Sequence, residues 1–205
     1  EAMRGVFAAG NTYRSLHTLY EELLAFGTGA SFVMPDSQSL IHHYPVTAGQ
    51  YALGTDYRGS VDTIGRRFSM TVDQLVTRFG LDAVSDSVRS MYQSRGGDQR
   101  IEVLHFVEPR MPDETSATHG ALAAPWRECF LEAGATDDRV LSESGYDWFP
   151  ALAPRWIVPA GAAYGESPGR DSIGDIKELQ FKQLRKAQAI DYQTKPPLQV
   201  PTTTK

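Results

Sequence analysis

The chain has 205 residues, one cysteine and a formal net charge of −5, with 41% hydrophobic and 22% charged residues. These proportions are typical of a globular protein, and a single cysteine excludes a disulfide framework and a cysteine-based zinc cluster. The acidic balance argues against tight, charge-driven binding to a DNA backbone, and no apolar run approaches the roughly 20 residues of a membrane span. The chain starts without an initiator Met or a secretory signal, so we expect a fragment of a longer protein.

The first half of the chain predicts one helix followed by short antiparallel strands. Asn11 is a suitable N-cap, and apolar residues then recur at spacings near 3.6 positions until Gly27, with Leu19 and Leu23 facing the core. Turn residues follow at intervals of about 8 to 12 positions, which favours an antiparallel sheet over alternating strands and helices. We expect strands at 30–34, 40–46, 51–55 and 61–68, the last two forming a hairpin.

Two short helices are predicted next. Thr71 and Gln74 have the spacing of a capping box, so a helix should begin after Thr71. This helix should bury Leu75 and Phe79, and a second helix should span 85–93.

Residues 101–107 predict a central strand. Val103, His105 and Val107 alternate with Leu104 and Phe106, and both sets are largely apolar, so we expect the strand to be covered on both faces. Beyond it we expect a surface loop at 109–124, strands at 126–132 and 140–141, and an extended, irregular segment at 149–158.

The last forty residues predict a long amphipathic helix. Ser167 and Pro168 form a helix start, and the helix should extend to about Tyr192, more than about 30 Å at 1.5 Å per residue. Its apolar stripe consists of Ile173, Ile176, Leu179, Leu184, Ala187 and Ile190. Residues 198–200 resemble the start of a strand. We interpret the helix and the interrupted strand as requiring a missing continuation or a partner chain.

The sequence contains no recognisable catalytic motif. Neither GxGxxG nor GxxxxGK[ST] occurs in a suitable place, and Ser142–Gly145 lacks the first glycine of a nucleophile elbow. The adjacent His42 and His43 should point to opposite sides of a strand, which does not suit one metal ion. We expect His105 and the lone Cys129 in the core.

A set of short segments, in the same order along the chain, resembles the head-to-tail connecting (portal) proteins of short-tailed, podovirus-type bacteriophages. The resemblance covers nearly the whole chain apart from 109–124. The segments are FGTGA at 26–30, YRGSVDT at 57–63, FSMTVDQLV at 68–76, LSESGYD at 141–147, PRW at 154–156, YGESP at 164–168, DIKEL at 175–179 and KPPL at 195–198.

The resemblance implies an α+β fold with a mixed, mainly antiparallel sheet, packed helices and a long C-terminal helix. Residues 1–165 would form a region like the wing of a portal subunit. Residues 166–205 would form a helix entering the stem and the start of a strand. Portal subunits are several times longer, so the family's C-terminal part would be missing.

The resemblance also implies a function. Such proteins form a ring, typically a dodecamer, at one capsid vertex of the virion, and double-stranded DNA passes through its channel. They contact the capsid protein, the packaging motor (terminase) and tail or adaptor proteins, and they assemble in the host cytoplasm. The family has no active site, so we expect no enzymatic activity, no cofactor and no membrane span.

Candidate contact residues follow from this interpretation. The helix residues Ile173, Ile176 and Leu184 are candidates for contacts between subunits. Four aromatic residues are further candidates, with a local core as the alternative: Trp126, Trp148, Phe149 and Trp156. Three basic residues are candidates for a DNA-facing or stem position, with simple complementarity to the helix dipole as the alternative: Lys182, Arg185 and Lys186.

Two other functions remain open at this point. The first is a hydrolase that uses loop carboxylates near Asp113 or Asp137, which would need two acids converging on one cleft. The second is an unrelated protein-interaction domain, which would predict a closed fold ending near Val200.

Overall fold

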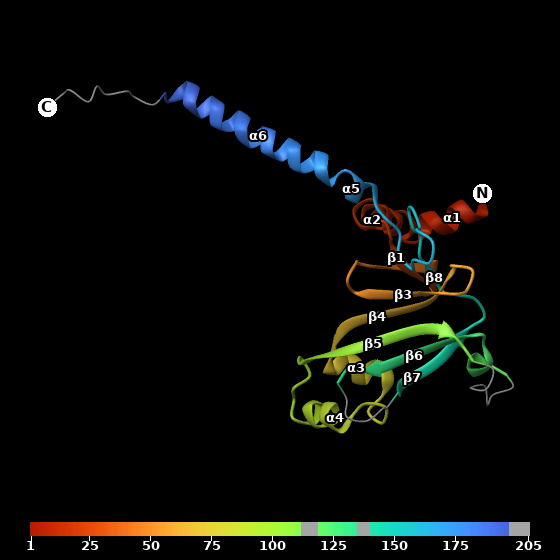
Figure 1. The fold of residues 1–205 in the computed structure, drawn as a ribbon. Helices are drawn as coiled ribbons and strands as arrows, with labels where there is room; N and C mark the ends of the chain where they lie inside the picture. Colours follow the sequence, from red (N-terminus) through yellow and green to blue (C-terminus); the bar gives the residue numbers. More distant parts are fainter. Residues whose placement is uncertain (112–118, 135–139, 197–205) are drawn as a thin grey trace, which may run out of the picture.

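The computed structural model describes residues 1–111, 119–134 and 140–196, which form an α+β body with one projecting helix (Figure 1). The helices are α1 (Ala2–Ala9), α2 (Thr12–Phe26), α3 (Val72–Phe79), α4 (Asp86–Gln93), α5 (Pro168–Asp171) and α6 (Ile173–Thr194), with a 3-10 turn η2 (Ala121–Ala123). The strands are β1 (Ala30–Asp36), β2 (Leu40–Val46), β3 (Tyr51–Thr55), β4 (Val61–Thr71), β5 (Arg100–Pro109), β6 (Trp126–Glu132), β7 (Val140–Tyr146) and β8 (Ala151–Leu152). The predicted fold class is confirmed.

We expected one mixed, mainly antiparallel sheet; the strands form two sheets, and every described pairing between strands is antiparallel. One sheet has the order β2-β1-β8, and the other has the order β3-β4-β5-β6-β7. The hairpin of β3 and β4 is confirmed, and β7 is longer than the two residues expected. In the irregular segment at 149–158, only Ala151 and Leu152 form a strand, which pairs with β1.

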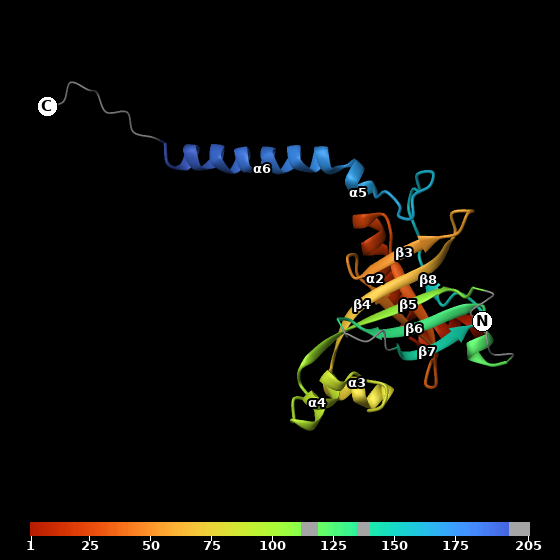
Figure 2. The same cartoon turned by 60° about the horizontal axis from the view of Figure 1, so that its bottom comes forward.

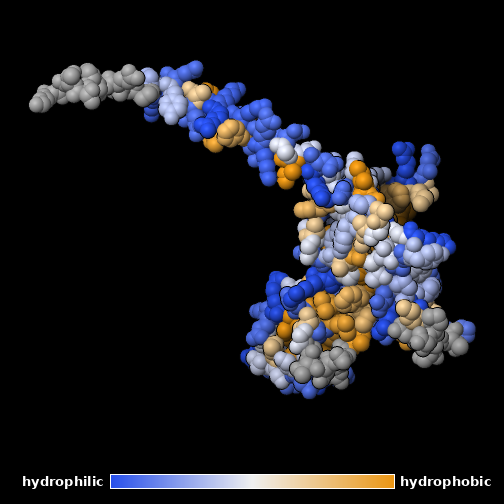
Figure 3. Space-filling model, viewed as in Figure 1, coloured by the Kyte–Doolittle hydropathy of each residue, from blue (hydrophilic) through white to orange (hydrophobic). Residues whose placement is uncertain are grey.

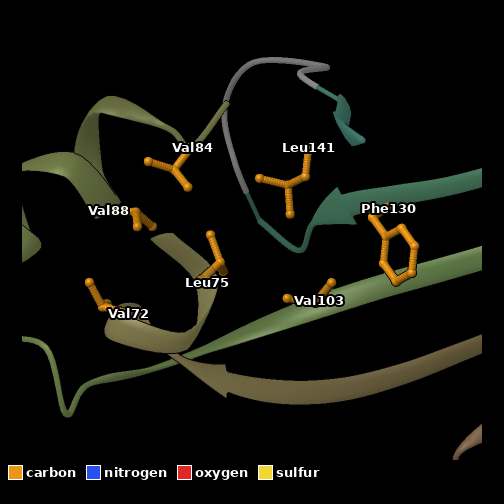
Figure 4. Packing of buried hydrophobic residues seen from close by; sticks show 7 residues of the cluster. All are labelled: Val72, Leu75, Val84, Val88, Val103, Phe130 and Leu141. Carbon is orange, nitrogen blue, oxygen red and sulfur yellow. The ribbon is translucent and has the colours of Figure 1, made fainter. Parts of the chain in front are cut away.

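Two hydrophobic cores cover the same face of the larger sheet. The first lies between that sheet and helices α3 and α4, where Leu75, Val88 and Val103 are fully buried (Figure 4). The second lies between the two sheets and contains Phe32 from β1 and Ile64 from β4. On the opposite face, Leu104 and Phe106 are only half-buried. We expected β5 to be covered on both faces, but only one face is fully covered.

The helices show where sequence patterns succeed and fail. The capping box is present, because Thr71 Oγ1 accepts the Gln74 N–H at 3.2 Å while Gln74 Oε1 accepts the Thr71 N–H at 3.0 Å. Leu19 of α2 is buried, whereas Leu23 and Phe79 are half-buried at the margins of the fold. Helix α1 was not expected from the sequence, and none of its residues is buried.

The long C-terminal helix is interrupted near its start. We expected one helix from Ser167, but α5 ends at Asp171 and α6 begins at Ile173, with Ser172 between them. Helix α6 then extends away from the body in both views (Figures 1 and 2). The strand expected at 198–200 lies outside the described residues.

Candidate functional site

Segments that carry the family resemblance meet where the long helix leaves the body. We call this meeting point the junction, and define it as residues 26–30, 154–157 and 164–168. The Trp156 N–H donates to the Gly27 carbonyl at 2.8 Å, and the Gly165 N–H donates to Thr28 Oγ1 at 2.8 Å. Segments separated by more than 120 positions in the sequence are therefore joined directly.

Two glycines allow the junction to close. Gly27 ends α2 in the left-handed conformation with φ 76°, as glycines after helices commonly do. A β-carbon on Gly165 would meet the Gly27 carbonyl oxygen at much less than a normal contact distance and the Trp156 nitrogen at 2.9 Å. The backbones approach so closely that neither position has room for a side chain.

The junction leads directly into α5, which ties the base of the long helix to the body. Ser167 is buried and its Oγ accepts the Arg170 N–H at 2.9 Å, which caps the first turn. Arg170 pairs with Glu166 at 2.6 Å, and α5 packs on the end of α2. The start of α6 is thus held by hydrogen bonds and packing.

Helix α6 itself has no buried residue in the described chain. The five large aliphatic residues of the predicted stripe are each 44–58% exposed: Ile173, Ile176, Leu179, Leu184 and Ile190. Figure 3 shows apolar patches open to solvent among hydrophilic side chains along the helix. An apolar stripe on an exposed helix is a surface that another element normally covers.

The three basic candidates lie in the middle of α6, outside its last turn, and are exposed, but two of them have partners. Lys182 pairs with Glu178 at 2.6 Å, one turn earlier, and the guanidinium of Arg185 lies 5.0 Å from the centre of the Phe181 ring. Both Lys182 and Glu178 are well exposed, so this pair contributes little to stability.

The four aromatic candidates divide into two groups. Trp126 and Phe149 pack against the second core with their rings 6.4 Å apart, which matches the local-core alternative. Trp148 and Trp156 are 68% and 50% exposed. They remain candidates for contacts with another chain.

A buried polar cluster, which the sequence did not predict, joins the two cores. Arg66 Nε donates to His105 Nδ1 at 3.0 Å, and His105 Nε2 lies 2.9 Å from Glu128 Oε1. The Tyr146 hydroxyl donates to the same Glu128 oxygen at 2.8 Å. The His105 ring stacks on Phe130 with centroids 4.1 Å apart. We expected His105 in the core, and it is fully buried there.

Burial and hydrogen bonding oppose one another in this cluster. Burial lowers the pKa of His105, and the nearby charges of Arg66 and Arg78 lower it further, against the hydrogen bond with Glu128. Burial would raise the pKa of Glu128, but hydrogen bonds from His105 and Tyr146 outweigh it, so that pKa is lowered. The cluster therefore holds an ionised Glu128 beside a neutral His105.

The described residues offer little for catalysis or metal binding. Each of the four side chains of the buried cluster makes a hydrogen bond within it, and burial raises the pKa of the Cys129 thiol, which disfavours the reactive thiolate. Within 1–111, 119–134 and 140–196, no group of three or more metal-ligating side chains occurs. His43 is buried and His42 is half-buried beside Tyr44, on opposite sides of β2 as expected.

The loop carboxylates of the hydrolase alternative, near Asp113 and Asp137, lie outside the described residues. Among the helices that the structure describes, none combines the length and apolar character needed to cross a bilayer.

Comparison with known proteins agrees with the resemblance seen in the sequence. The family described as bacteriophage head to tail connecting protein matches residues 1–205. The chain is 46% identical over 200 residues to a probable portal protein of Bordetella phage BPP-1, and 44% identical over 204 residues to a portal protein of Salmonella phage epsilon15. These alignments cover 98% and 99% of this chain but 36% of each relative, so the chain spans about a third of their length. The chain belongs to the family of bacteriophage head to tail connecting proteins.

Proposed function

We propose that this chain is part of a structural subunit of a phage portal, the ring through which DNA enters and leaves one vertex of the capsid. Two relatives that are portal proteins by name share 44–46% identity with nearly all of the chain, which supports the same role. The observation that carries the proposal is α6, a 22-residue helix tied to the body at its base and uncovered along its apolar stripe.

Copies of the same chain are suitable partners for this stripe. An isolated helix is marginally stable in water and depends on packing, and each Å² of buried apolar surface contributes about 25 cal/mol. In a ring, one surface of each subunit meets a different surface of its neighbour, so helices stand beside helices around the whole circle. Ile173, Ile176 and Leu184 are the contact residues that we propose on α6.

A second apolar strip on α6 favours a ring over a two-fold dimer. Phe181 and Tyr192 are 56% and 67% exposed and lie 11 positions apart, about three turns, on one side of the helix. At about 100° per residue, this side begins about 60° beyond Leu184, so the apolar residues of α6 extend over more than half of its circumference. A helix with so wide an apolar surface suits two neighbours. Twelve subunits is the number that the family resemblance implies.

The charges of the chain suit a channel that does not bind DNA tightly. Each phosphate that a protein neutralises strengthens DNA binding and makes it more salt-dependent. A net charge of −5, with Lys182 already paired to Glu178, supports only weak attraction between the chain and DNA. Lys182, Arg185 and Lys186 are the residues that we propose to face DNA or to line the stem.

The partners and location follow from the same proposal. In the virion, the ring would contact the capsid protein around the vertex and tail or adaptor proteins below it. During assembly in the host cytoplasm, it would contact the packaging motor (terminase). Residues 1–165 would form the wing-like region, and residues 166–205 would carry the chain into the stem. The complete protein would act as a scaffold and channel without enzymatic activity or a cofactor.

A matched pair of substitutions tests the role of α6. Ala187 lies within the apolar stripe, and Ala189, two positions later, is on the opposite side of the same helix. We expect Ala187→Asp in the complete protein to reduce ring formation at least tenfold in light scattering and electron microscopy, while Ala189→Asp assembles normally. If the two variants assemble equally well or fail equally, the stripe is not the contact between subunits.

A further inference from the structure

The turn between β3 and β4 presents one side chain almost completely to solvent. Tyr57 is 88% exposed, the largest exposed fraction among the large apolar residues that the structure describes. The turn is nevertheless well held, because Asp56 Oδ1 accepts the N–H groups of Arg58 at 2.9 Å and Ser60 at 2.8 Å. Arg155 also donates to the Gly59 carbonyl at 2.6 Å, which ties the turn to the junction.

The side chains at the tip of this turn form one unit. Arg58 Nε donates to the Tyr57 hydroxyl at 2.6 Å, and the guanidinium lies 5.1 Å from the centre of the ring. The tip therefore presents an aromatic ring and a positive charge together. Tyrosine and arginine are enriched among the few residues that carry most of the binding energy at protein interfaces, and a pre-organised tip loses little entropy on binding.

An apolar pocket with a negative rim lies on a different part of the body, between the β1–β2 hairpin and the end of β7. We call it the Trp148 pocket. Its volume is about 410 Å³, within the range of about 300–1,000 Å³ that is typical of binding pockets. Six of its lining residues are Met34, Leu40, Ile41, Tyr146, Asp147 and Trp148. Asp147 is the one charged side chain that lines it in the described part of the chain.

The rim of the Trp148 pocket carries two exposed apolar side chains. Trp148 is 68% exposed and Leu40 is 66% exposed. Leu40 has φ 65°, a left-handed conformation that hairpin turns usually give to glycine. The fold thus places a leucine at the rim although its backbone conformation disfavours one, and such outliers often mark functional positions.

Local backbone chemistry favours a side chain over an added strand as the occupant. Strand β1 pairs with β8 at Ser31 and Phe32, and the Val33 N–H donates to the Pro150 carbonyl at 2.7 Å, so pairing on this edge is described only as far as Val33. Pro35 lies beyond this point and has no N–H to donate to a further strand. A projecting side chain can enter the pocket without needing that hydrogen bond.

We propose that the Tyr57–Arg58 tip of one copy inserts into the Trp148 pocket of the next copy in the ring. The Tyr57 ring enters the apolar pocket, and the positive charge of Arg58 faces Asp147 and the Trp148 ring. The tip and the pocket share no residue, so the contact can repeat head to tail from copy to copy, as a closed ring requires. This inference rests on the proposed function, because it needs a ring of copies.

Charge reversal in the complete protein tests the contact. Arg58→Asp and Asp147→Arg each bring like charges together, and we expect each to raise the concentration needed for half-maximal ring formation at least tenfold. The double variant restores opposite charges and should return that concentration to within about threefold of wild type. Arg95→Asp and Asp98→Arg, in the exposed loop after α4, are the matched controls and should assemble like wild type.

A second double-mutant cycle tests the same contact without changing any charge. Tyr57→Ala and Trp148→Ala should each weaken assembly, and the double variant should be no weaker than the worse single variant, because both remove the same contact. Rings that form normally in all single variants would overturn the contact while leaving the ring itself intact, and additive losses in the second cycle would also overturn it. A wild-type protein that stays monomeric would overturn the proposed function and this contact with it.

Discussion

Arg66 and His105 are register partners on β4 and β5, and Arg66 Nε donates to His105 Nδ1 at 3.0 Å. Because Nδ1 accepts this bond, the single proton of the neutral imidazole is on Nε2, where it faces Glu128 at 2.9 Å. A second proton on His105 would have to displace Arg66 and would place two positive charges together in a buried site. The cluster that joins the two cores therefore depends on a neutral histidine.

This arrangement predicts a loss of stability in mild acid. The pKa of His105 is lowered in the folded state from the ordinary value of 6.5, chiefly by burial, so the unfolded state binds a proton more readily. The stability is complete above about pH 6.5 and should fall below it, by up to about 1.4 kcal/mol per pH unit until the folded state also takes up the proton. Urea unfolding at pH 7.5 and 5.5 measures the difference.

Two variants assign this pH dependence to named groups. His105→Gln should be less stable at pH 7.5 but should lose less stability between pH 7.5 and 5.5 than wild type. Burial also lowers the pKa of His43, so His43→Gln should remove a separate part of the dependence of the free energy of unfolding on pH.

Below about pH 4.5, protonation of Glu128, whose pKa is lowered from 4.5 in the folded state, should destabilise the fold further. A slope unchanged in His105→Gln would contradict the account of the cluster.

The capping box at the start of α3 predicts that a substitution at the cap lowers the free energy of unfolding more than a substitution elsewhere on the same helix. Thr71→Ala removes the oxygen that accepts the Gln74 N–H, and N-cap replacements of this kind cost about 1 kcal/mol. Thr77→Ala, on the exposed surface of the same helix, is the control and should change the free energy of unfolding by less than about 0.5 kcal/mol. Equal effects in urea unfolding would show that the cap does not stabilise the fold.

Alanine substitutions at two glycines, one before and one after α5, should change the stability of the protein in opposite directions. Gly165→Ala would press a β-carbon against Gly27 and Trp156, so we expect destabilisation of about 1–3 kcal/mol. Gly174→Ala meets no atom within 4 Å and lies inside α6, where alanine is a better helix former by up to about 1 kcal/mol. Thermal unfolding followed by circular dichroism distinguishes the two. A neutral Gly165→Ala would mean that the junction is looser than the structure indicates.

Local signals explain which parts of the fold could be predicted from the sequence. The hairpin of β3 and β4, the capping box at Thr71 and the alternation along β5 depend on residues close together in the sequence. Helix α1 has Glu1 as its N-cap without a side-chain capping hydrogen bond, and it buries no residue, so the sequence gave no clear signal for it. On α2 the apolar spacing was only partly reliable, because Leu19 is buried as predicted while Leu23 is half-buried, and the apolar residues beside them, Tyr20 and Leu24, are exposed.

In the candidate site, too, some features could be predicted from the sequence and others could not. The apolar stripe of α6 follows from helical periodicity alone, and its exposure could not be known without the surrounding structure. The cluster of Arg66, His105, Glu128 and Tyr146 joins four strands across as many as 80 positions, and no local spacing marks it. Its only hint was a histidine in an otherwise apolar alternation. The junction was present in the sequence as three separate short segments, two of which contain glycine, and their meeting depends on the fold.

The most direct test of the account is the mass of the complete protein in solution at micromolar concentration, measured by size-exclusion chromatography with light scattering. If copies cover the apolar stripe of α6 by standing side by side, the protein elutes as one closed species of many subunits, close to twelve. A protein that remains monomeric at these concentrations, with the stripe covered by its own remaining residues, would contradict the account.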